Sequence, residues 1–304
     1  MIEFEKTFPV DKRPDTVLAL GVFDGVHCGH REIISAAVEI ARGNGSVVTA
    51  VTFFPHPREI ICGKSPELLI PPAKRRELLL SAGADEVAVI NFSPEIAEME
   101  PEDFIRNLLD SKNFNLTGLC VGEHWRFGRK GKGDSKLLGK MLADANVIFS
   151  PTPEKKYHSA IISATAIRHA IFSGDLTTAK NMLGRDPALF GKVVSGCGEA
   201  GKLLAAPTAN LEVSCGVIPP NGVYAGSVEY NNIIYKAAVN IGTSPTFGDR
   251  GRRVEIHLIG FSGNLYGTEL EVKLTRLIRP EKKFTDPAAL KAQIAADIRS
   301  VLDF

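Results

Sequence analysis

Hydrophobic and polar positions follow an alternating plan in the first part of the chain. Short apolar runs predict strands at 16–20, 47–54, 86–92 and 116–121. Between and after them, apolar residues recurring every three or four positions predict helices at 31–42, 74–80, 101–109 and 135–142. Strands that alternate with helices favour a mostly parallel sheet covered by helices on both faces.

The pattern changes after about Gly184. From Gly191 onward the chain has short alternating strands, many glycines, and turn signals at 219–222 and 229–232. This pattern is typical of an antiparallel barrel or sandwich, and the apolar spacing over 287–302 predicts a closing helix. We therefore expect two domains, 1–186 and 187–304, a division that the length of 304 residues also favours.

Charge and cysteine usage narrow the class of protein. The formal net charge is +1, so the chain lacks the basic excess of a dedicated nucleic-acid binder. No apolar run reaches membrane-spanning length, and the opening segment, MIEFEKTFPVDKRPD, is charged and has no signal core. The five cysteines are scattered without a CxxC pair, which is typical of reduced thiols. We expect a cytoplasmic protein without a nucleic-acid, membrane or obligate protein partner.

The segment from Gly21 to His30 carries the first candidate site. It joins the first predicted strand to the first predicted helix, where parallel sheets bind ligands and helix N-termini bind phosphate. Gly21, Gly25 and Gly29 allow tight turns, and His27 and His30 share one face of a helical turn. The alternatives are a chance histidine pair or a zinc site. The strand, glycines, histidines and helix together favour a nucleotide site, where imidazoles stabilise developing phosphate charge.

A second segment, Ile162 to Arg168, opens another predicted helix. Ser163 or Thr165 can cap this helix, and Arg168 can reach a phosphate as a forked donor. Alone, such a segment is usually only a capped helix. Together with the histidine segment, it supplies the other half of a clamp for a triphosphate.

These two segments, GVFDGVHCGH and ISATAIR, resemble the HxGH nucleotidylyltransferase superfamily. The stretches TFFPHPRE at 52–59 and VGEHWRFG at 121–128 narrow the resemblance to the FMN adenylyltransferase half of bacterial FAD synthetase. The resemblance implies a Rossmann-like α/β fold in which His27, His30 and Arg168 are catalytic. It implies ATP contacts from Gly21, Phe23, Asp24, His27, His30, Ser163, Thr165 and Arg168. It implies flavin contacts from Pro55, Pro57, Phe127 and His124, the last standing where the family usually has Asp or Asn.

The second half of the chain has a glycine loop, GCGEAGK, at 196–202. It matches both GxGxxG and GxxxxGK weakly, because Leu203 follows where a Walker loop needs Ser or Thr, and Pro207 argues against a following helix. We interpret it as a loop beside a phosphate site built on β structure. The residues assigned to ATP binding here are Gly196, Gly201 and Lys202.

Two further segments offer metal and acid–base chemistry. In an extended segment Thr208 and Asn210 point the same way, and their oxygens suit Mg²⁺ held by ATP phosphates. Alternation over 254–258 places Glu255 on the face opposite the buried residues. A carboxylate there can accept the proton of an attacking hydroxyl. Taken alone, the first segment is more typical of a turn, and the alternative for Glu255 is an ordinary exposed barrel glutamate.

The second half also resembles a known family. GKLLAAPTANL, PPNGVYAG, VNIGTSPTFG, VEIHLIGF, NLYGTELEV and RPEKKF are similar to the riboflavin kinase domain fused behind the adenylyltransferase in bacterial FAD synthetases. The resemblance implies a small antiparallel β-barrel, Mg²⁺ bound by Thr208 and Asn210, and Glu255 as the catalytic base. The departures are Ala205 and Ala206 in place of a Gly-aromatic pair, Lys202 in place of Arg, and Gly260 and Asn264 where Asp is common.

The resemblance covers nearly the whole chain and implies two ATP-dependent reactions, riboflavin to FMN and FMN to FAD. Riboflavin, FMN and ATP are then substrates, Mg²⁺ accompanies ATP, and the flavins are not redox cofactors. Three alternatives stay open: an adenylyltransferase with a decayed kinase domain, a nucleotidylyltransferase for a pantetheine or nicotinate nucleotide, and a flavin-storage protein without turnover.

Overall fold

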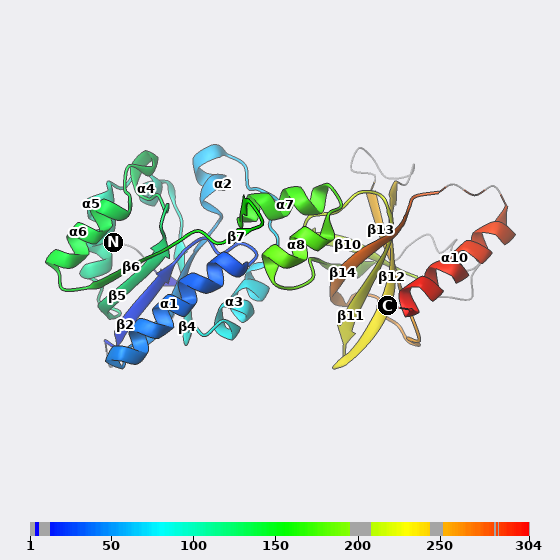
Figure 1. Cartoon of the computed structure of the whole chain (residues 1–304), viewed down its shortest axis with the longest axis horizontal. Coiled ribbons are helices and arrows are strands. Elements are labelled where there is room, and N and C mark those ends of the chain that lie inside the picture. The colour runs from blue at the N-terminus through cyan, green and yellow to red at the C-terminus, as the bar shows by residue number, and fades with distance from the viewer. Residues whose placement is uncertain are drawn as a thin grey trace. The chain divides into compact units, whose positions relative to one another are not determined.

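The computed structural model describes residues 4–5, 13–194, 208–243, 252–282, 284 and 286–303. The chain forms two compact units, one of residues 1–66 and 72–163 and the other of residues 67–71 and 164–304 (Figure 1). The second unit therefore includes two helices that precede the barrel. The predicted domain boundary at residue 186 stays a prediction.

The first unit is built on a sheet with the strand order β1-β4-β3-β2-β5-β6. Its strands are β1 Phe4–Glu5, β2 Asp15–Leu20, β3 Val47–Phe54, β4 Glu86–Asn91, β5 Asn115–Gly122 and β6 Ile148–Thr152. Strands β2 to β6 pair in parallel, and β1 pairs antiparallel to β4. The predicted, mostly parallel sheet is confirmed. Strand β2 is central, with β3 on one side and β5 on the other, so the strand order reverses beside it.

Helices connect these strands. They are α1 Cys28–Asn44, α2 Pro57–Cys62, α3 Pro72–Ser81, α4 Pro94–Ala97, α5 Pro101–Leu109 and α6 Ser135–Asp144, with a 3₁₀ turn, η1, at Arg129–Gly131 and a small hairpin of β7 Lys156–Tyr157 and β8 Ala160–Ile161. Helix α1 ends at Gly45, which has φ 73°. Glycine adopts this left-handed conformation without a side-chain clash, so it closes the helix. Gly45 thus ends α1 after Asn44, and the N-terminus of the helix lies just beyond β2.

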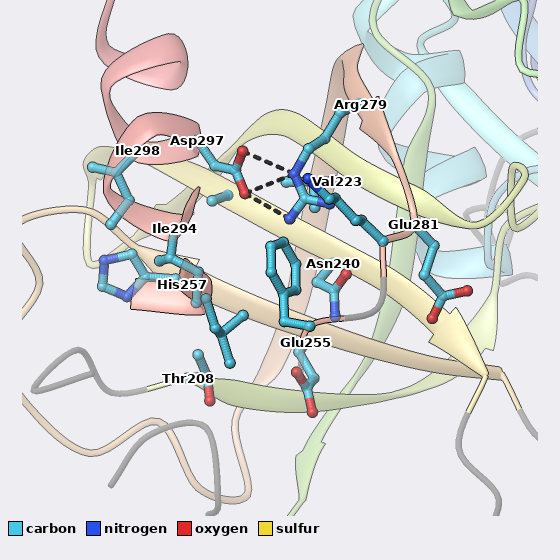
Figure 2. Close-up of a pocket in the computed structure, with 14 residues that line it drawn as sticks. Thr208, Val223, Asn240, Glu255, His257, Arg279, Glu281, Ile294, Asp297 and Ile298 are labelled. Carbon is cyan, nitrogen blue, oxygen red and sulfur yellow. Dashed lines mark hydrogen bonds and ion pairs between the residues drawn. The ribbon is translucent and has the colours of Figure 1, made fainter. Parts of the chain in front are cut away.

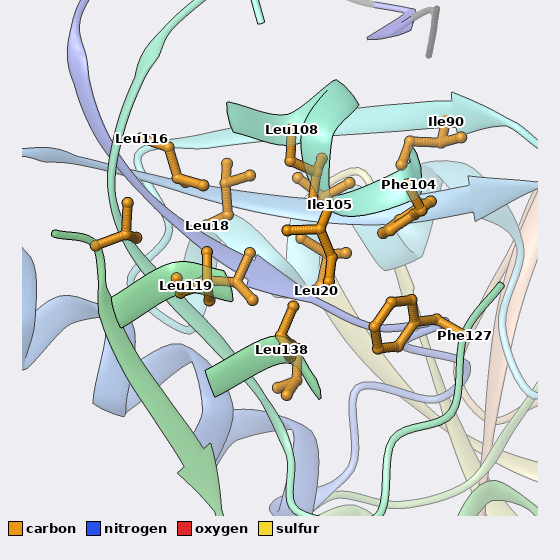
Figure 3. Packing of buried hydrophobic residues seen from close by; sticks show 14 of the residues in the cluster. Leu18, Leu20, Ile90, Phe104, Ile105, Leu108, Leu116, Leu119, Phe127 and Leu138 are labelled. Atoms are coloured by element: carbon orange, nitrogen blue, oxygen red, sulfur yellow. The ribbon is translucent and has the colours of Figure 1, made fainter. Parts of the chain in front are cut away.

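Leucine and aromatic side chains fill the core between the sheet and helices α5 and α6 (Figure 3). Leu18 and Leu20 of β2 and Leu119 of β5 are fully buried, as are Ile105 of α5 and Leu138 of α6. Burying one such side chain stabilises a fold by about 1.5–3 kcal/mol. The central strands therefore form a rigid base for the loops that leave their carboxyl ends.

The second unit is a closed β-barrel with the strand order β10-β13-β12-β11-β14-β9. Its strands are β9 Ala188–Val194, β10 Ala209–Cys215, β11 Gly222–Tyr230, β12 Ile233–Thr243, β13 Arg252–Leu258 and β14 Glu269–Pro280. All neighbouring pairs are antiparallel. Because these strands form a closed ring, the structure is the barrel and not the sandwich, the two folds that the sequence pattern predicted. Asn231 and Asn232, with φ of 51° and 63°, form the tight turn between β11 and β12.

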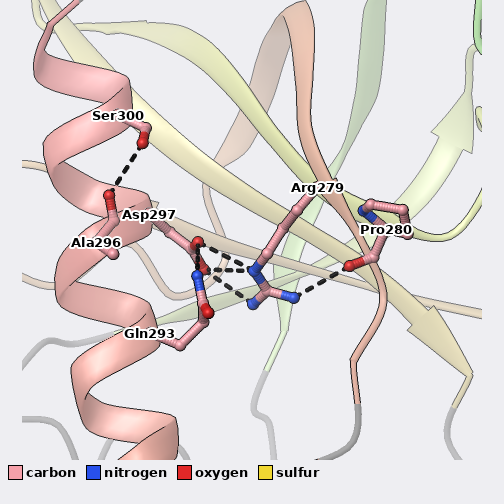
Figure 4. Close-up of polar contacts among 6 residues, drawn as sticks. All are labelled: Arg279, Pro280, Gln293, Ala296, Asp297 and Ser300. Carbon is pink, nitrogen blue, oxygen red and sulfur yellow. Dashed lines mark hydrogen bonds and ion pairs between the residues drawn. The ribbon is translucent and has the colours of Figure 1, made fainter.

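Among the described residues, helices α7 Ala164–Phe172, α8 Leu176–Leu183 and α10 Pro287–Leu302 accompany the barrel. Helix α10 has the bounds that the apolar spacing predicts. A carboxylate on it, Asp297, accepts hydrogen bonds from Arg279 of β14 and from the amide of Gln293 (Figure 4). This network fastens α10 to the outer face of the barrel. In the described part of the chain, no helix combines the length and the apolar character needed to cross a membrane.

Candidate active sites

The histidine segment lies at the carboxyl end of β2, beside the point where the strand order reverses. Such points are where open parallel sheets bind ligands. His27 caps α1, because its Nδ1 accepts the backbone N–H of His30 at 3.2 Å. The two rings stack with centroids 3.5 Å apart and planes at 17°. Since Nδ1 is an acceptor, the neutral His27 ring carries its proton on Nε2, which is therefore a hydrogen-bond donor.

The loop before the histidines is held in an unusual backbone conformation. Phe23 is fully buried and has φ 54°. Its ring meets that of His30 edge to face, with ring centroids 5.2 Å apart. Gly21 leaves room for this ring, since a Cβ there would lie 2.9 Å from Cε1 of Phe23. Asp24 is only 2% exposed. The predicted ATP residues Gly21, Phe23 and Asp24 thus form the buried base of the histidine pair, and their contacts with the nucleotide stay predictions.

The second predicted nucleotide segment divides between the two units. Ser163 is half-buried and is the last residue of the first unit, whereas Thr165 and Arg168 lie on α7 in the second. The helix begins at Ala164, after the predicted cap Ser163. Within the second unit, Nε of Arg168 donates to the carbonyl of Glu67 at 2.7 Å. The roles of Ser163, Thr165 and Arg168 toward ATP stay predictions.

A cavity of about 580 Å³ opens in the first unit near the ends of β3 and β5. Two of the predicted flavin residues, Pro57 and Phe127, line it, whereas the other two, Pro55 and His124, are not among its lining residues. The imidazole of His124 is 68% exposed, and its Nε2 lies 4.0 Å from Oε1 of Glu154. The lining residues are Val22, Phe53, Pro57, Ile60, Ile61, Phe92, Pro94, Ile96, Ala97, Glu98, Phe104, Trp125, Arg126, Phe127, Gly128, Lys130 and Gly131.

Aromatic rings form one wall of this cavity. Trp125 stacks on Phe127 with centroids 4.8 Å apart and planes at 15°, and Phe104 lies 5.6 Å from Phe127. Gly133 admits the Phe127 ring, because a Cβ at this glycine would lie 2.7 Å from the ring. Sequence reasoning found Phe127 and missed Trp125 and Phe104. The aromatic pair within 121–128 was the available signal for Trp125.

Charged groups surround the cavity rim. Nη1 of Arg126 lies 3.7 Å from Oδ2 of Asp134, the residue that caps α6. Backbone donation from Leu137 lowers the pKa of Asp134, and donation from Lys136 and the charge of Arg126 act in the same direction. Arg129 of η1 pairs with Glu98 at 2.8 Å. The rim therefore combines an aromatic wall with cations whose carboxylate partners hold the surrounding loops.

A second cavity, of about 200 Å³, lies in the barrel unit between β-strands and helix α10. Thr208 and Glu255, both predicted site residues, line it together (Figure 2). In cross-strand register Glu255 faces Asn210 of β10 on one side and Asn240 of β12 on the other. Sequence reasoning missed Asn240. The full lining is Thr208, Val223, Ala238, Asn240, Glu255, His257, Arg279, Glu281, Lys282, Phe284, Leu290, Ile294, Asp297 and Ile298.

The orientation of Glu255 follows from strand alternation. Val254, Ile256 and Leu258 are at most 4% exposed inside the barrel, and Glu255 lies on the opposite face, beneath α10. Nη1 of Arg253 approaches Oε1 of Glu255 at 3.3 Å. The predicted alternation of β13 is confirmed. A carboxylate held in this way, with the apolar residues Ile294 and Ile298 of α10 in the same cavity, can accept the proton of a hydroxyl bound there.

Two family models match the chain, each over a different part of it. A family model described as FAD synthetase matches residues 10–166, and one described as riboflavin kinase matches residues 183–304. The chain belongs to the bifunctional riboflavin kinase/FMN adenylyltransferase family. The proteins of that name from Escherichia coli K12 and Listeria monocytogenes are 34% and 33% identical to it. The first match covers 95% of this chain and 92% of the relative, and the second 92% and 90%.

A solved structure shares the fold over nearly the full length. It is a crystal structure from Streptococcus pneumoniae described as a macrolide-efflux protein, with a TM-score of 0.85 and 28% identity. The match covers 97% of this chain and 96% of that one. The likeness extends across both the FAD synthetase and the riboflavin kinase parts.

The riboflavin kinase part contains donors that fit Mg²⁺. Thr208 and Asn210 offer neutral hydroxyl and amide oxygens, and both residues are half-buried. Asn210 is in register with Glu255, and Thr208 lines the same cavity as Glu255. Hard oxygen donors beside a carboxylate suit a cation that arrives with ATP phosphates. Among the described residues, no cluster of three or more His, Cys, Asp or Glu has a metal-holding arrangement.

The glycine loop of the kinase part falls outside the described residues. Gly196, Gly201 and Lys202, predicted to bind ATP, lie in this stretch, as do Ala205 and Ala206. The other departures from the family pattern are described. Gly260 and Asn264 are exposed and are not lining residues of the barrel cavity. These two departures therefore lie outside the described lining of the barrel cavity.

Proposed function

We propose that this enzyme phosphorylates riboflavin to FMN in the barrel unit and adenylylates FMN to FAD with the histidine site of the first unit. ATP is the second substrate of both reactions. One observation carries the proposal: Glu255 stands between two asparagines in a cavity that it shares with Thr208 and with the apolar face of α10. The flavins are substrates and products here, and the enzyme needs no redox chemistry.

In the kinase reaction, the 5′-hydroxyl of riboflavin attacks the γ-phosphorus of ATP, and ADP leaves. Glu255 accepts the hydroxyl proton as the new O–P bond forms. Arg253 holds this carboxylate, and Ile294 and Ile298 of α10 offer an apolar surface to the flavin ring. Bound with ATP and held by Thr208 and Asn210, Mg²⁺ would neutralise charge on the phosphates. Gly196, Gly201 and Lys202 complete the proposed ATP contacts.

In the adenylyl transfer, a phosphate oxygen of FMN attacks the α-phosphorus of ATP, and pyrophosphate leaves. His27 and His30 donate hydrogen bonds to the phosphate oxygens on which charge develops, and Arg168 adds a fixed positive charge. Trp125 and Phe127 provide the wall against which the flavin ring stacks. The proposed nucleotide contacts also include Gly21, Phe23, Asp24, Ser163 and Thr165, and the proposed flavin contacts include Pro55 and Pro57. For His124, which is exposed and outside the cavity lining, a flavin contact is implied by the family resemblance alone.

The barrel cavity favours an active kinase over a decayed one. A decayed site would be expected to lose its carboxylate or its oxygen donors, and Glu255, Thr208 and Asn210 are all present. Gly260 and Asn264, where the family often has Asp, lie away from the cavity lining. A cytoplasmic location belongs to the same proposal and rests on the scattered cysteines, which lack a CxxC pair.

Product analysis tests both halves. The purified full chain is incubated with riboflavin, ATP and Mg²⁺, and flavins are separated over time. We expect FMN first and FAD second. His27→Ala should slow FAD formation by about 10²–10³-fold, the usual effect of removing a charge-stabilising donor, and FMN should accumulate. FAD formed from FMN but not from riboflavin would support the decayed-kinase alternative, and tight flavin binding without ATP consumption would support a storage protein.

A further inference from the structure

A buried arginine lies beneath the histidine loop of the first unit. Arg75, on helix α3, is only 4% exposed. Its Nη1 donates to the carbonyl of Val22 at 3.0 Å, to Oγ1 of Thr52 at 3.1 Å and, more weakly, to the carbonyl of Phe53 at 3.4 Å. A guanidinium is costly to bury, and the contacts of Nη1 offset part of that cost and hold the group in one position. Arg75 therefore joins α3 to the carboxyl ends of β2 and β3.

The carbonyl of Val22 is the centre of this arrangement. Besides Arg75, the hydroxyl of Thr52 donates to it at 2.8 Å. Two donors occupy the carbonyl, so the peptide plane between Val22 and Phe23 has one orientation. Rotation of that plane would change ψ of Val22 and φ of Phe23, and the φ of Phe23 is 54°. A non-glycine residue keeps a positive φ only when its surroundings hold it there.

The strained residue leads directly to the catalytic pair. Phe23 packs its ring edge against His30, and His30 stacks on His27. A continuous set of contacts therefore runs from Arg75 through Val22 and Phe23 to the two imidazoles. We propose that Arg75 is a positioning residue for adenylyl transfer, which keeps His30 parallel to His27. This inference rests on the proposed role of the histidines in FAD formation.

The sequence gives no sign of this role, because Arg75 stands in the run Lys74-Arg75-Arg76 on a helix. Such a run is normally a solvated face. Its neighbour Arg76 is exposed, and within the described residues its Nη1 donates to the carbonyl of Val87 at 3.3 Å. Arg76 is therefore a matched control of the same residue type on the same helix.

The experiment compares Arg75→Met, Arg75→Lys, Thr52→Val and Arg76→Met in the full chain. FAD formation from FMN is measured as kcat and as KM for ATP, and circular dichroism of each variant reports on folding. We expect Arg75→Met to lower kcat for FAD about a hundredfold, the effect of a small misplacement of catalytic groups. KM for ATP should change little, because the histidines act on the transition state. Arg75→Lys should recover part of the rate, Thr52→Val should lose less, and Arg76→Met should match wild type.

The ring signals of His27 and His30 in NMR spectra provide a second measurement. A positioning role predicts that they shift in Arg75→Met and, by less, in Thr52→Val. A folded Arg75→Met enzyme with wild-type kcat and unshifted histidine signals overturns the inference. If Arg75→Met does not fold, Thr52→Val with wild-type kcat and signals has the same consequence. A wild-type protein that makes no FAD would instead defeat the proposed function, and the histidine signals would still report on the contact between Arg75 and the loop.

Discussion

Arg279 of strand β14 and Asp297 of helix α10 form a two-pronged ion pair at the edge of the kinase cavity. Nε of Arg279 lies 3.0 Å and 3.1 Å from the two carboxylate oxygens, and Nη2 lies 2.9 Å from Oδ2. The Asp297 side chain is 5% exposed. Because Ile294 and Ile298 flank Asp297 on α10, this pair sets the distance between the apolar helix face and the barrel strands.

Asp297→Ala should therefore weaken riboflavin binding more than phosphoryl transfer. Removing one partner of a buried pair leaves an uncompensated charge, which typically costs about 3–5 kcal/mol of stability. We expect a lower melting temperature for the barrel unit and a higher KM for riboflavin, with kcat changed less. Asp303→Ala, an exposed aspartate at the end of the same helix, is the control. Equal KM values for riboflavin in the two variants would show that the pair does not shape the cavity.

The single tryptophan of the chain, Trp125, allows flavin binding to the first unit to be measured directly. We expect FMN to quench its fluorescence, since the ring stacks on Phe127 within the proposed flavin cavity. Phe127→Ala should weaken FMN binding about three- to tenfold by removing an aromatic contact worth about 0.5–1.5 kcal/mol. KM for FMN in FAD formation should rise in parallel.

His124→Ala is the informative comparison for that titration. Its imidazole is exposed and is not part of the cavity lining, so we expect FMN binding near the wild-type value. A loss of affinity in His124→Ala equal to that in Phe127→Ala would instead support the flavin contact that the family resemblance implies for His124.

The pattern of apolar residues predicts the fold because most elements are periodic along the chain. Strand β3 has the predicted bounds 47–54 and helix α10 the predicted bounds 287–302. Strand β6, Ile148–Thr152, is missing from the prediction. Its residues are mostly exposed or half-buried, and Pro151 stands within it, so neither alternation nor an apolar run marks it.

The candidate sites are predictable only where their residues are close in sequence. His27 and His30 lie three residues apart, and Thr208 and Asn210 two apart, so short motifs reveal them. Arg75 and Asn240 reach their sites through tertiary packing and strand register. Arg75 stands in a basic run typical of a helix face. Asn240 lies within the family-like stretch VNIGTSPTFG, but no pattern there marks its side chain as part of the cavity.

Thr208→Ala should weaken the use of Mg²⁺-ATP in the kinase reaction. Loss of the hydroxyl removes one hard oxygen donor, so KM for ATP should rise, and additional Mg²⁺ should restore part of the rate. The measurement is FMN formation at several Mg²⁺ concentrations, with FAD formation from FMN as the internal control. A rate that falls equally at all Mg²⁺ concentrations would assign Thr208 a role other than metal binding.

Glu255→Gln gives the sharpest test of the kinase mechanism. The amide keeps the size of the side chain and can still hydrogen-bond, but it cannot accept the proton of the riboflavin hydroxyl. FMN formation should fall by about 10²–10⁴-fold, the usual contribution of a general base, whereas FAD formation from FMN should stay near wild type. Glu229→Gln, an exposed glutamate on β11, is the matched control, and circular dichroism checks folding. Folding should change little, because Glu255 lies on the face of β13 opposite the barrel core.

A Glu255→Gln enzyme that forms FMN at the wild-type rate would make Glu255 an ordinary strand residue. Another group in the cavity would then have to accept the proton of the attacking hydroxyl, and His257 is the nearest such group along the strand.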